Sequence, residues 1–158
     1  MKTFVYIDHF KSDVQPASWE ALGVAKSFGT AVALVFGSDA DEISKAAFEY
    51  GADEVIVVDD AALTDYRAEP YASTLTALAA SASPDLILFP TTARTREFAA
   101  MSAVDLNTGV LTDVSKFEQD GDKLVATRPI YEGKVLEKTV CSGKHVMATI
   151  PARAFPKP

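Results

Sequence analysis

The sequence has few of the residues from which disulfides and metal sites are built. Its 158 residues include one cysteine, Cys141, and two histidines, His9 and His145. A single cysteine cannot form an internal disulfide, and such sparing use of cysteine is typical of the reducing cytosol. Structural zinc sites take about four Cys or His ligands, so a metalloenzyme is not expected. We therefore expect no bound metal and a cytoplasmic location.

Long hydrophobic runs are also missing. No apolar run approaches the roughly 20 residues that span a bilayer, and the longest candidate is residues 30–37. Residues 1–8 reach an acid, Asp8, directly after Phe-Val-Tyr-Ile and contain no small-residue cleavage site. This pattern is typical of a first strand and not of a signal peptide. We expect neither a leader peptide nor a membrane anchor.

The composition that remains is that of one packed domain. With 48% hydrophobic and 23% charged residues in 158 positions, there is room for a single core, without an interdomain cleft. The net charge of −7 disfavours a nucleic-acid partner. Charge is uneven, because residues 121–158 hold 7 basic and 3 acidic side chains while residues 1–120 hold 8 and 19. This basic end favours contact with an acidic partner surface, or else lysines that protect sheet edges from aggregation.

Strand and helix patterns alternate along the first two-thirds of the chain. Short apolar runs rich in Val, Ile, Leu and Phe lack polar alternation, as expected of strands buried on both faces. Apolar stripes with helical spacing lie between and after them. This order predicts an α/β fold, a Rossmann-like doubly wound and mainly parallel sheet with helices on both faces. The predicted strands are residues 3–8, 31–37, 54–58 and 86–89.

After residue 107 the pattern becomes one of hairpins. The turn dipeptides Asp120-Gly121, Glu132-Gly133 and Ser142-Gly143 separate strand-like runs. They predict a C-terminal antiparallel β meander over residues 113–150, added to the parallel sheet or reaching out from it. Residues 151–158 contain three prolines and are expected to form an extended linker or tail. The predicted organisation is a single domain over residues 1–150 followed by this tail.

A candidate binding crevice follows from the expected topology. If the strand order is 3-2-1-4-5, the ends of the first and fourth strands flank the point where the order reverses, which is where such sheets take ligands. Asp8 and His9 would line one side of the crevice and residues 90–96 the other. Threonine hydroxyls and arginines at a helix N-terminus favour an anion such as phosphate. The candidate cofactor-binding residues are Asp8, Thr91, Thr92, Arg94 and Arg96.

The same residues have a structural alternative. Thr92 or Thr95 would cap the helix, while Arg94 and Arg96 pair with Glu97 or with a partner protein. His9, beside Asp8, is a candidate general base, although histidines at strand ends more often have surface or hydrogen-bonding roles. Glycine-rich phosphate turns and the Gly-x-Ser-x-Gly nucleophile motif are missing from the sequence. We therefore expect no catalytic constellation, and no enzyme activity of this chain alone.

Seven segments in order resemble the N-terminal domain of the electron transfer flavoprotein alpha subunit. Each segment alone is weakly specific, but together they extend over nearly the whole chain at compatible spacing. They are YGADEVIVVDD (50–60), EPYA (69–72), PDLILF (84–89), TARTRE (92–97), GVLTDV (109–114), TRPIYEGK (127–134) and IPARAFP (150–156).

The resemblance implies an adenine nucleotide alpha hydrolase-like fold in an alpha-type subunit that docks a beta-type subunit. Such assemblies carry electrons on FAD from dehydrogenases to an acceptor. It also implies that FAD is held mainly by a C-terminal domain that would follow residue 158, and that AMP belongs to the partner subunit. The meander over residues 113–150 is then the expected interface. The alternative is a stand-alone nucleotide-binding protein of the universal stress type that binds AMP or ATP. Such proteins normally have a glycine-rich turn after the fourth strand, and residues 89–94 have no glycine.

Overall fold

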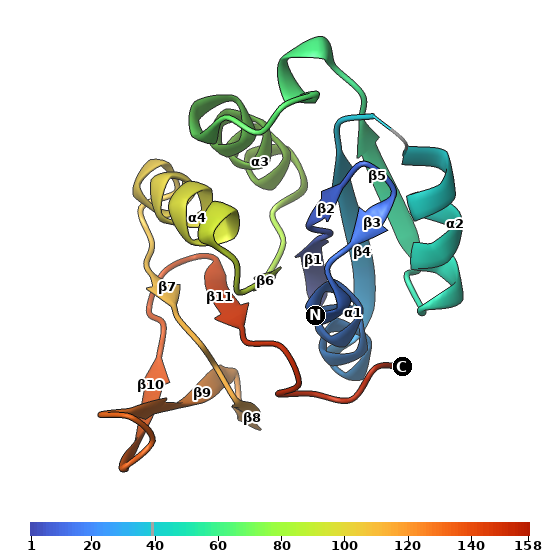
Figure 1. Ribbon diagram of the computed structural model, residues 1–158. Helices are drawn as coiled ribbons and strands as arrows, with labels where there is room; N and C mark the ends of the chain where they lie inside the picture. Colours follow the sequence, from blue (N-terminus) through green and yellow to red (C-terminus); the bar gives the residue numbers. More distant parts are fainter. Residues whose placement is uncertain (39) are drawn as a thin grey trace.

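The main sheet and its helices account for most of the chain. The computed structural model describes residues 1–38 and 40–158 (Figure 1). The strands of the main sheet are β1 (Lys2–Tyr6), β4 (Thr30–Phe36), β5 (Glu54–Val58), β6 (Leu86–Pro90), β7 (Val110–Leu111) and β11 (Val146–Ile150). The helices are α1 (Pro16–Phe28), α2 (Ala40–Glu49), α3 (Ala68–Ala82) and α4 (Ala93–Asp105). A short hairpin, β2 (His9–Phe10) with β3 (Asp13–Val14), follows β1, and a 3₁₀ turn, η1 (Ala61–Leu63), follows β5.

The six strands of this sheet lie in the order β5-β4-β1-β6-β11-β7, and every neighbouring pair is parallel. The predicted doubly wound α/β fold is confirmed, and so is the order assumed for the first four strands. Helices α1 and α2 pack on one face of the sheet, while α3 and α4 pack on the other. Because both faces are covered, the central strands are apolar along nearly their whole length.

The two faces of the sheet have different cores. The face under α3 and α4 holds a cluster of aromatic rings, in which Phe98 meets Tyr6 edge to face with 4.8 Å between ring centroids. On the other face Trp19 of α1 stacks on Tyr50, with centroids 4.6 Å apart. The rings of the first cluster are Tyr6, Phe36, Tyr66, Tyr71, Phe89 and Phe98. This cluster fixes α3 and α4 above the carboxyl ends of β1 and β6.

A separate three-stranded antiparallel sheet follows β7. Its strands are β8 (Lys116–Asp120), β9 (Lys123–Ile130) and β10 (Val135–Val140), in the order β10-β9-β8. Two of the three predicted turns connect them. Gly121 has φ +59° in the β8–β9 turn, a left-handed conformation that glycine adopts without steric cost. Figure 1 shows this small sheet at one end of the molecule, beside β7 and β11.

The prediction for residues 145–150 was wrong in one respect. The Ser142-Gly143 turn does not return the chain antiparallel to β10, because β11 joins the main sheet and pairs parallel with β6 and β7. Met147, Ala148 and Ile150 are fully buried there. The physical reason is the gain in apolar burial, since a strand inside the covered sheet is shielded on both faces. The meander proper therefore ends at Val140.

Residues 151–158 contain no helix or strand and pack back against α1. The Glu20 carboxylate, 4% exposed, accepts hydrogen bonds from the backbone N–H groups of Arg153 (3.0 Å) and Phe155 (3.3 Å). The Phe155 ring stacks on Phe117 of β8. A Cβ atom at Gly23 would lie 3.1 Å from the carbonyl oxygen of Pro156, so a small residue is needed there. The tail is thus held at defined points along α1, and its role as a linker remains a prediction.

Replacing Glu20 by alanine is expected to release this tail. The carboxylate satisfies two backbone donors, and its loss should cost about 2 kcal/mol of local stability. Trypsin cleavage after Arg153, followed by mass spectrometry, should then be about 30-fold faster than in the unmodified protein. Glu42→Ala, an exposed carboxylate change on α2, serves as the control. Equal cleavage rates in the two variants would show that Glu20 does not hold the tail.

Candidate functional site

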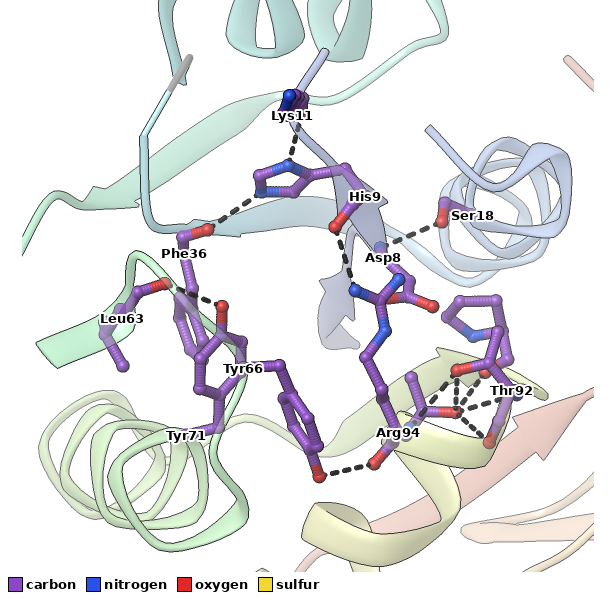
Figure 2. A network of polar contacts seen from close by, with 12 residues as sticks. Asp8, His9, Lys11, Ser18, Phe36, Leu63, Tyr66, Tyr71, Thr92 and Arg94 are labelled. Carbon is purple, nitrogen blue, oxygen red and sulfur yellow. Dashed lines mark hydrogen bonds and ion pairs between the residues drawn. The ribbon is translucent and has the colours of Figure 1, made fainter. Parts of the chain in front are cut away.

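An ion pair closes the crevice between β1 and β6. Asp8 lies just after β1, and Arg94 lies in the first turn of α4, just after β6. An Arg94 guanidinium nitrogen (Nη2) lies 3.0 Å from Asp8 Oδ1, and the Asp8 side chain is fully buried (Figure 2). Arg94 also donates to the carbonyl oxygen of His9 at 3.4 Å. The structure thus brings Asp8 and Arg94 together across the point where the strand order reverses.

Two opposing effects act on the pKa of the Asp8 carboxyl group. Burial raises its pKa, while the neighbouring Arg94 guanidinium acts in the opposite direction. Neither carboxylate oxygen has a well-aligned hydrogen bond among the described residues, although the backbone N–H of Asp8 donates to Ser18 Oγ at 3.1 Å. A carboxylate between β1 and the first turn of α4 occupies the place where this kind of sheet would take a ligand anion. Asp8 therefore places a buried carboxyl group of the protein itself at this edge of the sheet.

Thr92 is used as the cap of α4. Its side chain accepts a hydrogen bond from the backbone N–H of Thr95 at 3.2 Å, and Thr95 Oγ1 accepts from the backbone N–H of Thr92 at 3.0 Å. This reciprocal pair satisfies donors that would otherwise be free at the helix start. The structural alternative holds for this residue.

Thr91 and Arg96 point to a different partner, Asp113. Thr91 Oγ1 donates to Asp113 Oδ1 at 2.9 Å, and Arg96 Nη2 lies 3.1 Å from Asp113 Oδ2. The expected pairing of the arginines with Glu97 was wrong, because Glu97 instead accepts the Tyr66 hydroxyl at 2.8 Å. The five candidates therefore form no single site: Asp8 and Arg94 pair at the crevice, whereas Thr91 and Arg96 bind the start of the segment that leads to β8.

His9 is engaged through both ring nitrogens. Nδ1 lies 2.7 Å from the carbonyl oxygen of Lys11, and Nε2 lies 2.8 Å from that of Phe36. Both ring nitrogens thus face backbone carbonyl oxygens, which argues against His9 as a general base. The side chain links the β2–β3 hairpin to β4.

A cavity of about 350 Å³ lies beside this histidine, over the carboxyl ends of β1 and β4. Sequence reasoning missed it, because a third of its lining residues come from the segment after β5, where no motif marks a site. Burial raises the pKa values of Tyr66 and Tyr71 in this wall, and the bond to Glu97 adds to the effect at Tyr66. The lining residues that bear on ligand chemistry are His9, Lys11, Phe36, Asp65, Tyr66, Tyr71 and Arg94.

Within residues 1–38 and 40–158, no three His, Cys, Asp or Glu side chains gather in a way that could hold a metal ion. In the same part of the chain, no helix combines the length and the apolar character needed to cross a membrane.

The fold and this edge define a Rossmann-like domain with a buried Asp8–Arg94 ion pair at the carboxyl ends of β1 and β6. The sequence model of a protein family, described as the electron transfer flavoprotein domain, matches residues 3–158. The chain belongs to this family. The match favours the family resemblance over the universal stress alternative.

Curated relatives agree with this assignment. The chain is 34% identical over 149 residues to electron transfer flavoprotein subunit alpha of Syntrophomonas wolfei, covering 94% of this chain and 47% of the relative. It is 34% identical over 165 residues to protein FixB of Azorhizobium caulinodans, covering 98% and 45%. It is 28% identical to the LctC subunit of a lactate dehydrogenase (NAD(+),ferredoxin) of Acetobacterium woodii, covering 94% and 39%. The chain thus spans about half the length of the first two relatives, and it corresponds to their N-terminal domain.

Proposed function

We propose that this chain is a scaffold domain of an alpha-type electron transfer flavoprotein subunit, and that it docks a beta-type subunit. The assembly would receive electrons from dehydrogenases on FAD and pass them to an acceptor. The chain itself would supply no catalytic group, would bind no nucleic acid, and would act in the cytoplasm. The observation that carries the docking proposal is an unusual concentration of exposed apolar side chains on β10 and the turn before it.

Four large apolar side chains lie exposed within ten residues of each other. Leu136 is 66% exposed and Val140 is 43% exposed, and they project from the same face of β10. Lys138 lies between them on that face, and Val135 lies on the opposite face. Exposed large apolar side chains gathered on one strand commonly mark a protein–protein contact. We call these residues the apolar edge: Tyr131, Val135, Leu136 and Val140.

The backbone of β10 is unpaired along one side. Among the described residues, β10 pairs only with β9, so it forms one edge of the small sheet. A six-residue edge strand with apolar side chains invites contact with another chain, and proteins usually cover or protect such edges. The net positive charge of residues 121–158 adds attraction to an acidic partner surface. Both features favour a partner at this end of the molecule.

The cofactors are better placed outside this chain. The N-terminus of α4, the natural position for a diphosphate, faces the buried Asp8 carboxylate, whose charge repels phosphate. The turn after β1 holds no glycine that would let the backbone approach a ligand closely. The described residues therefore do not fit FAD. This supports FAD in the remainder of an alpha-type subunit and AMP in the beta-type partner, as the family resemblance implies.

Co-expression with a beta-type subunit tests the proposal. The two chains should co-elute as a complex, and Leu136→Asp combined with Val140→Asp should weaken their association by about 100-fold, because two charges would be buried without partners. Isothermal titration calorimetry of the purified chains measures the change. Val104→Asp, at an apolar position of α4 that is 79% exposed and far from β10 in sequence, is the matched control.

Two results would count against the proposal. Association that is unchanged by the β10 double variant would remove the apolar edge from the interface. Purified chain alone that carries stoichiometric yellow flavin would contradict the placement of FAD outside these residues.

A further inference from the structure

The cavity beside His9 has the size and the wall of a small-molecule site. Its volume is about 350 Å³, at the lower end of the range for ligand pockets. It is formed by the β2–β3 hairpin, the end of β4, the loop after β5, α3 and the start of α4 (Figure 2). Five segments that are distant in sequence thus converge on one hollow at the ligand-binding edge of the sheet.

The apolar part of the wall is aromatic and flat. Phe36, Tyr66 and Tyr71 line the cavity from three different elements. The Tyr71 hydroxyl donates to the carbonyl oxygen of Leu63 at 2.9 Å, and the Tyr66 hydroxyl is bound to Glu97. Both hydroxyls are already bonded inside the protein, and Phe36 and Tyr71 are buried, so the rings open to a ligand are those of Tyr66, which is half-buried, and Phe10, which is 66% exposed and also lines the cavity. Ring surfaces favour a flat apolar body.

The polar part of the wall is basic. His9, Lys11 and Arg94 line the cavity, against the single acid Asp65. Lys11 makes no ion pair among the described residues, and its ammonium lies 5.7 Å from the Phe10 ring centroid. Its φ of +53° is costly for a residue with a side chain, and such strain gathers at binding sites.

The arrangement of charge favours a ligand with one negative charge. Arg94 is already paired with Asp8, which leaves Lys11 as the cation of the wall that makes no ion pair among the described residues. A dianionic phosphate would also face the buried Asp8 carboxylate behind Arg94, which disfavours it. A carboxylate needs only one cation with free donors, and Lys11 has three.

We propose that this cavity binds a small aromatic carboxylate, with its carboxylate at Lys11 and its ring against Tyr66 and Phe10. This site is separate from the β10 interface, so its test does not depend on subunit docking. The bound ligand would contact the β2–β3 hairpin, which carries two of the basic residues of the wall, His9 and Lys11.

Calorimetric titration with 2-naphthoate tests the site, with 2-naphthamide as the uncharged probe of the same shape. Naphthoate should bind at least about tenfold more tightly than the amide, and Lys11→Glu should weaken it by about tenfold or more, because the cation becomes an anion. Lys45→Glu, which reverses an exposed lysine on α2 outside the cavity, should leave binding unchanged. Backbone NMR shifts should move at Gly37 and Thr64 and stay fixed at Trp19.

Further probes separate the ligand classes. Inorganic phosphate binding as tightly as naphthoate would overturn the aromatic part of the proposal. Tighter binding of AMP than of naphthoate would replace it with a nucleotide site. Naphthoate binding that survives Lys11→Glu, or no binding at about millimolar concentration, would overturn the site.

Discussion

Replacing Arg94 by alanine is expected to lower the free energy of unfolding by about 3 kcal/mol, because it leaves a fully buried carboxylate without its cation. Asp8 has no exposed surface, and the guanidinium at 3.0 Å is its one ion-pair partner in the described part of the chain. Urea denaturation followed by Trp19 fluorescence measures the loss, since the stacked Trp19–Tyr50 pair lies on the opposite face of the sheet.

The loss should depend on pH in a defined direction. Burial already raises the pKa of Asp8 in the folded protein, and removal of Arg94 would raise it further. When the pKa of a carboxyl group is higher in the folded than in the unfolded protein, the group favours the folded state only while it is protonated. That contribution is lost as the pH rises through the folded-state pKa. The deficit of Arg94→Ala should therefore be smallest near about pH 4 and grow toward about pH 8.

Asp8→Asn supplies the matched control. It removes the buried charge, and Arg94, which is 28% exposed, can turn toward water. Its cost should be about 1 kcal/mol, and the double variant should be more stable than Arg94→Ala alone. Equal losses in the two single variants that simply add in the double variant would show that the buried charge is not the cause.

Phe98→Ala is expected to cost about 4 kcal/mol, the upper part of the range for loss of a buried aromatic ring. Phe98 is fully buried and lies 4.8 Å from the Tyr6 ring and 5.6 Å from the Phe89 ring, so its loss leaves a hole beneath α4. Because α4 carries Arg94, the hole would also loosen the ion pair. Thermal and urea unfolding by circular dichroism measure the effect.

Two variants control for this change. Phe98→Leu keeps most of the volume and should cost about 1.5 kcal/mol or less. Phe48→Ala removes a ring on α2 that is 52% exposed and should change stability by no more than about 0.5 kcal/mol. A similar loss from Phe48→Ala and Phe98→Ala would contradict the packing account.

The order of strands and helices could be predicted from the sequence because the sheet is covered on both faces. Burial on both faces gives uninterrupted apolar runs such as residues 31–36, and the intervening helices show their own period. The β8–β9 hairpin was predictable from Asp120-Gly121, since the left-handed turn requires a residue like glycine. These signals are local, so the sequence alone carries them.

The partners of polar side chains were not predictable in the same way. Arg94, Arg96 and Glu97 are neighbours in sequence, which suggested a local pairing. The structure joins Arg94 to Asp8 and Arg96 to Asp113. Each pairing depends on how the ends of separate strands meet, and no local pattern encodes that geometry. The placement of β11 was missed for the same reason, because an apolar run of five residues fits equally well in a hairpin or in a covered sheet.

The position of β11 has a consequence for the order of folding. β11 lies between β6 and β7, and Val146 pairs with Leu86 across 60 positions of the chain. During synthesis β6 therefore has no strand on this side until residues 146–150 have been made, after those of the small sheet. Contacts of such long sequence separation slow folding. The last strand of the chain therefore completes the centre of the main sheet, after the residues of the small sheet have been made.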